Sequence, residues 1–299
     1  MNFKSGFTAI IGRPNVGKST LLNTLIGKKI VIMSEKPQTT RNKITGVLTG
    51  SDFQIVFIDT PGIHKPKNKL GELMVELAEN SIKDVDLILY LVDATAPIGK
   101  GDEFVNGILV NSKVPVIIGL NKIDNLTKEE IPRVKELWRQ SGVTQKVVPI
   151  SALQQINLDV LIEEIKVMLP EGPKYFPDDM VTDQPENLVV AEIIREKVLS
   201  FTMEEVPHST AVVVESMEER ANGILYVAAT IYVERDSQKG IMIGKGASKI
   251  KEIGNAARVE LEGILNTQIY LDLRVKVRKN WRKSDLDLRK MGYDPKFLK

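Results

Sequence analysis

Near its start the chain reads Gly12-Arg13-Pro14-Asn15-Val16-Gly17-Lys18-Ser19. This stretch fits G-x-x-x-x-G-K-S, the phosphate-binding P-loop pattern. An apolar run at residues 7–11 precedes it, and apolar residues at helical spacing follow it at Leu21, Leu22, Leu25 and Ile26. The pattern therefore predicts a strand, a glycine-bounded loop and a helix. In that setting the loop turns its backbone N–H groups towards phosphates, and the helix N-terminus adds a partial positive charge.

Two side chains of the P-loop have separate expected tasks. Lys18 should reach the β- and γ-phosphates of a nucleotide, and the Ser19 hydroxyl should coordinate Mg²⁺. Thr20 follows directly and is counted with the expected nucleotide-binding residues. The alternative is a glycine turn that carries a lysine by chance, and it leaves the strand and helix patterns on both sides unexplained.

The composition is that of a globular protein without cysteine chemistry. A length of 299 residues suggests about two domains, and the absence of cysteine excludes disulfides and thiolate metal sites. No apolar run approaches the ~18 residues of a membrane-spanning helix, and residues 1–6 are too short and polar for a secretion signal, so we expect a cytoplasmic protein. The net charge is only +2, yet residues 239–299 hold 15 Lys+Arg against 7 Asp+Glu. This basic end predicts a polyanionic partner.

A second motif, Asp59-Thr60-Pro61-Gly62, follows the strand expected at residues 54–58. A carboxylate at the end of an apolar strand needs a cation or a donor. Beside a P-loop, Asp59 is expected to hold Mg²⁺ through a water, and Gly62 lets a backbone N–H approach the γ-phosphate. The alternative, a plain Pro-Gly turn, is credible only for the tetrapeptide in isolation.

A third motif, Asn121-Lys122-Ile123-Asp124, follows the buried strand expected at residues 114–120. The Asp124 carboxylate can accept hydrogen bonds from the N1–H and 2-amino groups of guanine, a donor pair that adenine lacks. The Asn121 amide can bridge loops, and the Lys122 methylenes can cover the base. Backbone N–H groups of Ser151-Ala152-Leu153, which follow the last strand at residues 146–150, can bind the guanine O6. The motif therefore predicts preference for GTP over ATP, although an isolated N-K-x-D would be an ordinary solvated turn.

The chain divides at a proline-rich stretch, residues 170–177, which predicts a semi-rigid linker. We expect an α/β domain at residues 1–170, with a mostly parallel sheet and helices on both faces, and a linker at residues 171–187. Residues 188–299 should form a smaller α+β domain. It is expected to contain a helix at 188–202, strands at 211–217 and 224–233 joined by an Asn222-Gly223 turn, and a strand at 268–277. Residues 278–283 are basic, with Trp281 expected to be exposed.

The stretch Ile243-Gly244-Lys245-Gly246-Ala247-Ser248-Lys249-Ile250-Lys251 looks like the RNA-binding loop of a KH domain. Such a loop lets a single-stranded backbone approach a helix N-terminus. Ala247 departs from the family pattern G-x-x-G, because an alanine makes φ > 0 costly. The alternative is a glycine-rich helix entry packed on a sheet. The expected RNA-binding residues are Ile243, Gly244, Lys245, Gly246, Ala247, Ser248, Lys249 and Lys251.

Together with Pro37-Gln38-Thr39-Thr40-Arg41, these motifs resemble the Era family of bacterial GTPases over essentially the full chain. The resemblance implies a Ras-like P-loop GTPase domain, a type II KH domain, and GTP or GDP with Mg²⁺ as ligands. It also implies binding of the 3′ end of small-subunit ribosomal RNA, action on pre-30S particles during small-subunit maturation, and peripheral association with the inner membrane.

The resemblance also assigns roles within the nucleotide site. Thr40 is expected to join Ser19 and Asp59 at Mg²⁺ when a γ-phosphate is present. Ile63 stands where many GTPases carry a water-orienting glutamine, which predicts slow intrinsic hydrolysis. A potassium ion near Asn15 is expected to take the place of an arginine finger. The expected catalytic residues are Asn15, Lys18, Thr40 and Gly62.

Two interpretations of the second half stay open from sequence. In the first, the chain is an RNA-binding regulatory GTPase whose switch loops set the orientation of the second domain. In the second, the C-terminal half docks a protein or a membrane and its KH-like fold is only a scaffold. The basic residues between 274 and 289 suit either interpretation.

Overall fold

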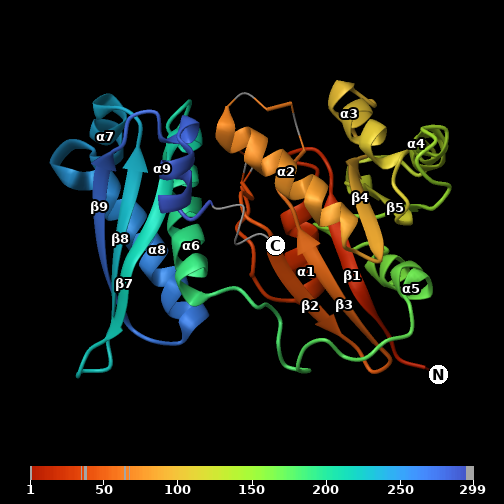
Figure 1. Cartoon of the computed structure of the whole chain (residues 1–299), viewed down its shortest axis with the longest axis horizontal. Coiled ribbons are helices and arrows are strands. Elements are labelled where there is room, and N and C mark those ends of the chain that lie inside the picture. Colours follow the sequence, from red (N-terminus) through yellow and green to blue (C-terminus); the bar gives the residue numbers. More distant parts are fainter. Residues whose placement is uncertain (1, 35, 37–38, 64, 67, 294–299) are drawn as a thin grey trace.

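The computed structural model describes residues 2–34, 36, 39–63, 65–66 and 68–293, which form two lobes side by side (Figure 1). The first lobe is built on a six-stranded sheet of order β2-β3-β1-β4-β5-β6. All neighbouring strands are parallel except β2, which is antiparallel to β3. The mostly parallel sheet predicted for this half is confirmed. Its strands are β1 (Lys4–Ile11), β2 (Ile44–Thr49), β3 (Phe53–Asp59), β4 (Leu87–Asp93), β5 (Val116–Asn121) and β6 (Val147–Pro149).

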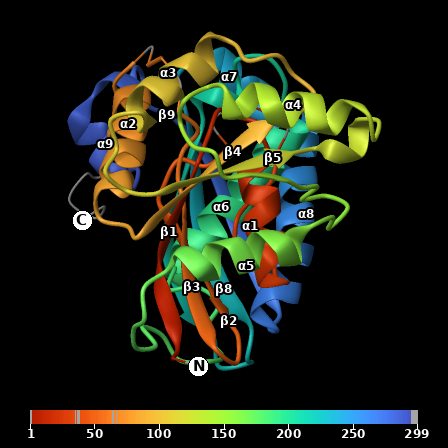
Figure 2. The same ribbon diagram turned by 90° about the vertical axis from the view of Figure 1, so that its right-hand side faces the viewer.

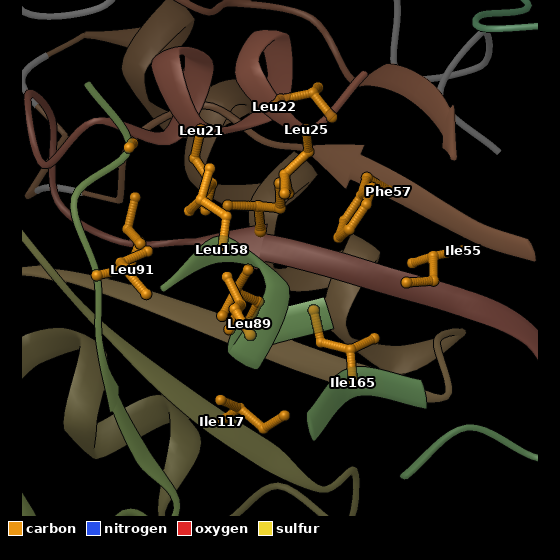
Figure 3. Packing of buried hydrophobic residues seen from close by; sticks show 14 of the residues in the cluster. Leu21, Leu22, Leu25, Ile55, Phe57, Leu89, Leu91, Ile117, Leu158 and Ile165 are labelled. Atoms are coloured by element: carbon orange, nitrogen blue, oxygen red, sulfur yellow. The ribbon is translucent and has the colours of Figure 1, made fainter. Parts of the chain in front are cut away.

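Helices cover both faces of this sheet. On one face, α1 (Lys18–Ile26) and α5 (Leu158–Met168) bury leucines and isoleucines against β3, β4 and β5 (Figure 3). Helix α5 lies in front of the sheet in the side view (Figure 2). On the other face, α2 (Lys69–Lys83), α3 (Lys100–Leu109) and α4 (Glu130–Arg139) pack against alternate residues of β1, β4 and β5. Burial on both faces explains why the central strands are continuous apolar runs.

The second lobe is built on a three-stranded sheet, with its three longer helices on one face. Strands β7 (Ala211–Glu219) and β8 (Leu225–Val233) are antiparallel, and β9 (Ile269–Val277) is parallel to β8. Gly223 takes φ +75° in the β7–β8 turn, in line with the Asn-Gly signal. Helices α6 (Glu186–Phe201), α7 (Asp236–Ile243) and α8 (Ser248–Leu265) contribute to one apolar core with this sheet. Helix α6 begins inside the segment predicted as linker, and α7 was missed because Gly240 lies within it.

The segment between the lobes follows the edge of the first sheet (Figure 1). The backbone N–H of Val47 in β2 donates to the carbonyl of Val181 at 2.9 Å, and the Thr182 hydroxyl donates to the carbonyl of Thr45 at 2.7 Å. Gln54 in β3 accepts from the backbone N–H of Tyr175 at 2.7 Å. The two contacts to β2 cover part of an otherwise open strand edge. The segment between the lobes is therefore anchored to the first lobe at several points along its length.

The C-terminal segment returns from the second lobe to the first. Helix α9 (Asp285–Lys290) lies beside α2 in both views (Figures 1 and 2), and the preceding 3₁₀ helix η4 (Trp281–Lys283) also contacts α2. They share a buried cluster with the apolar face of α2, Leu70, Leu73, Met74 and Leu77.

The expectation that Trp281 is exposed is wrong. Its side chain is fully buried, its ring stacks on Tyr293, and its Nε1–H donates to the carbonyl of Ser209 at 2.9 Å. The basic neighbours in sequence suggested solvent, whereas the partners of this ring come from distant segments.

Candidate functional site

The P-loop has the predicted setting, between the end of β1 and the start of α1. Gly12 and Gly17 take φ values of +153° and +99°. A Cβ on Gly17 would lie 2.4 Å from Nδ2 of Asn121, and one on Gly12 would lie 2.3 Å from the carbonyl oxygen of Leu91. Side chains at these two positions would therefore both strain the backbone and collide with the neighbouring strands.

The loop borders a cavity of about 640 Å³ at the carboxyl ends of the strands, where ligands bind in such sheets. Most of the predicted nucleotide-binding residues line it. Met33, Ser34, Thr39 and Asn125 also line it but were not predicted as nucleotide contacts. The predicted residues in the lining are Pro14, Asn15, Gly17, Lys18, Ser19, Thr20, Thr40, Gly62, Asn121, Lys122, Asp124, Ala152 and Leu153.

The other predicted residues lie outside the lining of this cavity. Arg13 turns away and pairs with the buried Asp102 at the start of α3, Nε to Oδ1 at 2.7 Å. Thr60 donates its hydroxyl to the carbonyl of Ile10 at 2.9 Å, which braces β3 against β1. The remaining residues in this group are Gly12, Val16, Asp59, Pro61, Ile63 and Ser151.

The three predicted metal ligands converge. Asp59 Oδ2 lies 3.1 Å from the Thr40 Oγ1 and 3.3 Å from the Ser19 Oγ, and the two hydroxyls are 3.1 Å apart. Asp59 is fully buried, and its Oδ1 has no hydrogen-bond partner among the residues that the structure describes. A hard cation such as Mg²⁺ prefers this set of oxygens and would satisfy the unpartnered one, directly or through water.

Burial perturbs the two charges beside this oxygen cluster. It raises the pKa of Asp59 to about 6, although the charge of Lys18 opposes the rise. It lowers the pKa of Lys18 to about 8, against the attraction of Asp59. The Lys18 ammonium donates to the carbonyls of Gly12 at 3.3 Å and Arg13 at 3.1 Å. At neutral pH both groups are mostly charged while poorly solvated, so a metal ion at one and a phosphate at the other would replace the missing water.

The predicted base site lies at the ends of β5 and β6. Asn121 bridges two loops, because its Nδ2 donates to the carbonyl of Val16 at 2.8 Å and its Oδ1 accepts from the N–H of Ala152 at 2.9 Å. The Lys122 ammonium pairs with Asp93 at the end of β4, Nζ to Oδ2 at 2.6 Å. Asp124 is exposed in the 3₁₀ helix η1 (Ile123–Asn125). The Asp124 carboxylate therefore lines the cavity next to Asn121 and Lys122, whose side chains are each held by the contacts above.

The backbone after Asp59 approaches the P-loop closely. A Cβ on Gly62 would lie 2.8 Å from the backbone nitrogen of Pro14. Ile63 donates its N–H to the carbonyl of Gly12 at 3.1 Å, and its side chain is fully buried in the core under α2 and α3. The Ile63 side chain therefore packs into the core and does not line the cavity, so it cannot orient a water there.

The KH-like loop joins α7 to α8. Gly244, Gly246 and Ala247 all take positive φ, at +74°, +59° and +62°. Ala247 thus adopts the left-handed conformation that is unfavourable for alanine by about 1–2 kcal/mol. Gly246 is exposed, and no atom would lie within 4 Å of an added Cβ. Lys245 and Lys251 are also exposed, so the entrance to α8 presents backbone and positive charge to solvent.

Part of one predicted motif cannot be placed. Pro37 and Gln38 lie outside the described residues, whereas Thr39, Thr40 and Arg41 are described. Within the described ranges, no helix combines the length and apolar character needed to cross a bilayer.

Comparison with known proteins agrees with both halves of the chain. Residues 7–122 match the family model of the 50S ribosome-binding GTPases, and residues 205–282 match that of the KH domain. Two solved structures of Era align over 98% of the chain with a TM-score of 0.93 each. One is an Era variant from Aquifex aeolicus bound to GDP·AlF4⁻, at 42% identity and covering 100% of that chain. The other is Era in complex with MgGDPNP and nucleotides 1506–1542 of 16S ribosomal RNA, at 43% identity and covering 99%.

A full-length relative decides the family. The GTPase Era of Alkaliphilus metalliredigens (strain QYMF) is 52% identical over 295 residues, which is 98% of this chain and 100% of that protein. This relative covers both the first lobe, with its P-loop and the oxygen cluster of Ser19, Thr40 and Asp59, and the second lobe, called the KH lobe below. The chain therefore belongs to the Era family of GTPases.

Proposed function

We propose that this GTPase binds GTP and GDP with Mg²⁺, binds the 3′ end of small-subunit ribosomal RNA, and acts on pre-30S particles in small-subunit maturation. The observation that carries the nucleotide part is the single cavity that joins the P-loop to Asp124. The RNA part is supported by the exposed loop of the KH lobe and by the relative that holds 16S ribosomal RNA.

In this proposal each group of the cavity has one task. Lys18 and the P-loop N–H groups hold the phosphates, and Asp124 selects guanine while Lys122 covers the base. Ser19, Thr40 and Asp59 would hold Mg²⁺, which would neutralise charge on the β- and γ-phosphates when bound. Gly62 allows a backbone N–H to approach the γ-phosphate. With no glutamine after the D-T-P-G motif, hydrolysis is slow and the chain works as a switch.

We further propose residues 1–170 as the GTPase domain, 171–187 as the linker and 188–299 as the type II KH domain. The site of action is the cytoplasm, and attachment to the cell membrane, where it occurs, is peripheral and on the cytoplasmic face. In this proposal the α7–α8 loop, with Lys245, Ser248, Lys249 and Lys251, takes the RNA backbone.

The RNA function is tested with a fluorescent oligonucleotide that matches the 3′ end of 16S ribosomal RNA, in the presence of a non-hydrolysable GTP analogue. We expect binding that weakens with salt, with a log–log slope of about −0.7 per phosphate contact, and that falls when the sequence is scrambled. Vesicles containing phosphatidylglycerol are the parallel sample. Binding to vesicles without any preference for RNA sequence would contradict the proposal and favour a membrane-docking KH lobe.

We also propose a potassium ion at Asn15. This residue lines the cavity with φ +65°, and its amide oxygen is a suitable ligand for a monovalent cation beside the phosphates. Hydrolysis should be about tenfold faster in potassium than in sodium at equal ionic strength, which corresponds to ~1.4 kcal/mol of barrier. Asn15→Ala should lose the difference with GTP still bound. Asn15→Gly, which tolerates positive φ, should lose it too, and equal rates in both salts for the unmodified chain would rule the ion out.

A further inference from the structure

Arg41, the residue after the expected Mg²⁺ ligand Thr40, is buried in the other lobe. It is 1% exposed. Its Nη1 donates to the carbonyl of Thr210 at 2.6 Å and to the Tyr293 hydroxyl at 3.3 Å. Its guanidinium carbon lies 6.0 Å from the ring centroid of Trp281 and 5.9 Å from that of Tyr293. The chain after Thr40 is thus fixed to the second lobe.

The residue before Thr40 is held from the same side. Arg195, in the middle of α6, is fully buried, and its Nη2 donates to the carbonyl of Thr39. Glu192, one turn earlier, fixes this guanidinium by accepting from its Nε at 2.9 Å. Thr40 therefore lies between two peptide segments, and an arginine contact with the second lobe restrains each of them.

A third contact lies earlier in the same loop. The Lys36 ammonium donates to the carbonyls of Leu199 and Thr202 at the C-terminal end of α6, a site that favours a cation. The Lys36 and Arg195 contacts join this loop to α6. The Arg41 contacts join it to Thr210, directly before β7, and to Tyr293. The oxygen of Thr40 meets Asp59 and Ser19 in the same structure.

Burying the Arg41 guanidinium costs desolvation free energy, which is a large cost for a contact that only joins two lobes. Desolvation lowers its pKa, and no carboxylate lies within 4.0 Å of it among the described residues. Carbonyls and aromatic faces are its partners instead. An apolar side chain could fill such a slot at least as stably, so a guanidinium buried there points to a geometric role. Its fork fixes direction, which is what the neighbouring residue needs in order to reach a metal ion.

We propose that Arg41 and Arg195 are positioning residues for GTP hydrolysis: the KH lobe, through them, holds Thr40 where it binds Mg²⁺. The inference rests on the proposed nucleotide function and adds that the metal site is completed by the second lobe. Because GTP with Mg²⁺ needs Thr40 and GDP does not, bound GTP stabilises the contact between Arg41 and the KH lobe. By linkage, loosening that contact weakens GTP more than GDP.

The test uses the full-length chain with Trp138→Phe. The sequence has two tryptophans, so Trp281, which lies against Arg41, becomes the only tryptophan reporter. Arg41→Met keeps the volume of the buried slot, and Arg41→Lys keeps a donor for the carbonyl of Thr210. Dissociation constants are measured for a non-hydrolysable GTP analogue and for GDP, both with Mg²⁺. Acrylamide quenching of Trp281 is recorded in each nucleotide state.

We expect Arg41→Met to bind the GTP analogue about tenfold more weakly, or ~1.4 kcal/mol, with GDP affinity nearly unchanged. Arg41→Lys should recover part of the preference. In the Trp138→Phe chain with Arg41 intact, which is the parent here, the GTP analogue should protect Trp281 from quenching more than GDP does. Arg41→Met should abolish that difference. Lys29→Ala is the matched control, because it removes another contact between the lobes, Nζ to Glu196 Oε2 at 2.6 Å, that does not flank Thr40.

Four outcomes would overturn the proposal or separate it from the proposed nucleotide function. Equal losses for GDP and the GTP analogue, or an equal effect of Lys29→Ala, would mean that lobe contact in general matters and would overturn the proposal. If Thr40→Ala removes the preference for the GTP analogue but Arg41→Met does not, the positioning role fails while the metal site stands. If the parent binds neither nucleotide, the proposed function itself fails.

Discussion

Asp124→Asn is expected to change the base preference of the cavity from guanine to xanthine. The Asp124 carboxylate faces the cavity from the exposed helix η1, where it can accept from both N–H donors of guanine. Hydrogen bonds to charged groups contribute about 1.5–3 kcal/mol each. Asparagine keeps one neutral acceptor for N1–H but places its NH₂ group opposite the 2-amino group of guanine, so GTP should bind about 100-fold more weakly. Xanthine has a carbonyl in place of the 2-amino group, and the asparagine amide can donate to it.

The measurement is the affinity of parent and variant for GTP and XTP under equal Mg²⁺. The exposure of Asp124 makes a folding defect a poor explanation for any loss. Asn125→Ala is the matched control, because it removes the neighbour that donates to Asp124 at 3.2 Å without changing the carboxylate. An unchanged preference for GTP in the Asp124 variant would remove this residue from the base site.

The local motifs were predictable because each one combines a strand end with a short, chemically defined loop. The sequence placed the P-loop, Asp59 and Asn121 at or directly after the ends of separate strands. A parallel sheet brings such ends to one edge, so their convergence followed from topology. The same argument predicted the bridging of loops by the Asn121 amide, which is observed at 2.8 and 2.9 Å.

The contacts between the lobes could not be predicted in this way. Arg41 meets Thr210 and Tyr293 across more than half of the chain, and neither partner carries a motif. Trp281 was misjudged for the same reason, since its burial depends on Tyr293 and on helix α2. Propensity describes neighbours in sequence, whereas these residues are placed by tertiary packing. A lone arginine directly after the expected metal ligand was the only available signal.

Within the P-loop, the position of Arg13 was also beyond the sequence pattern. The motif counts it among the phosphate-binding residues, yet its side chain lies against Gly101, where an added Cβ would be 2.6 Å from the Arg13 Cδ. Its charge pairs with the buried Asp102. The motif defines the path of the backbone, while the direction of a side chain outside the invariant Gly, Lys and Ser depends on which helix packs nearby.

The second large effect is expected at Gly246, and it tests directly whether the KH loop of this chain binds RNA. Gly246→Asp places a negative charge where phosphates should approach, and repulsion of about 1–4 kcal/mol at ~4 Å would weaken RNA by about tenfold or more. The backbone there has φ +59° and open space beside it, so aspartate and asparagine both fit. Gly246→Asn is thus the matched control, with equal bulk and no charge.

The decisive measurement is the affinity of the full-length parent, Gly246→Asp and Gly246→Asn for the 3′-terminal 16S oligonucleotide. It is made with a GTP analogue bound, and affinity for that analogue is measured alongside. We expect Gly246→Asp to lose RNA affinity, Gly246→Asn to stay close to the parent, and all three to bind the GTP analogue equally. RNA affinity that survives unchanged in Gly246→Asp would contradict the account, because the KH loop would then be a scaffold and the RNA-binding role of the second lobe would fall.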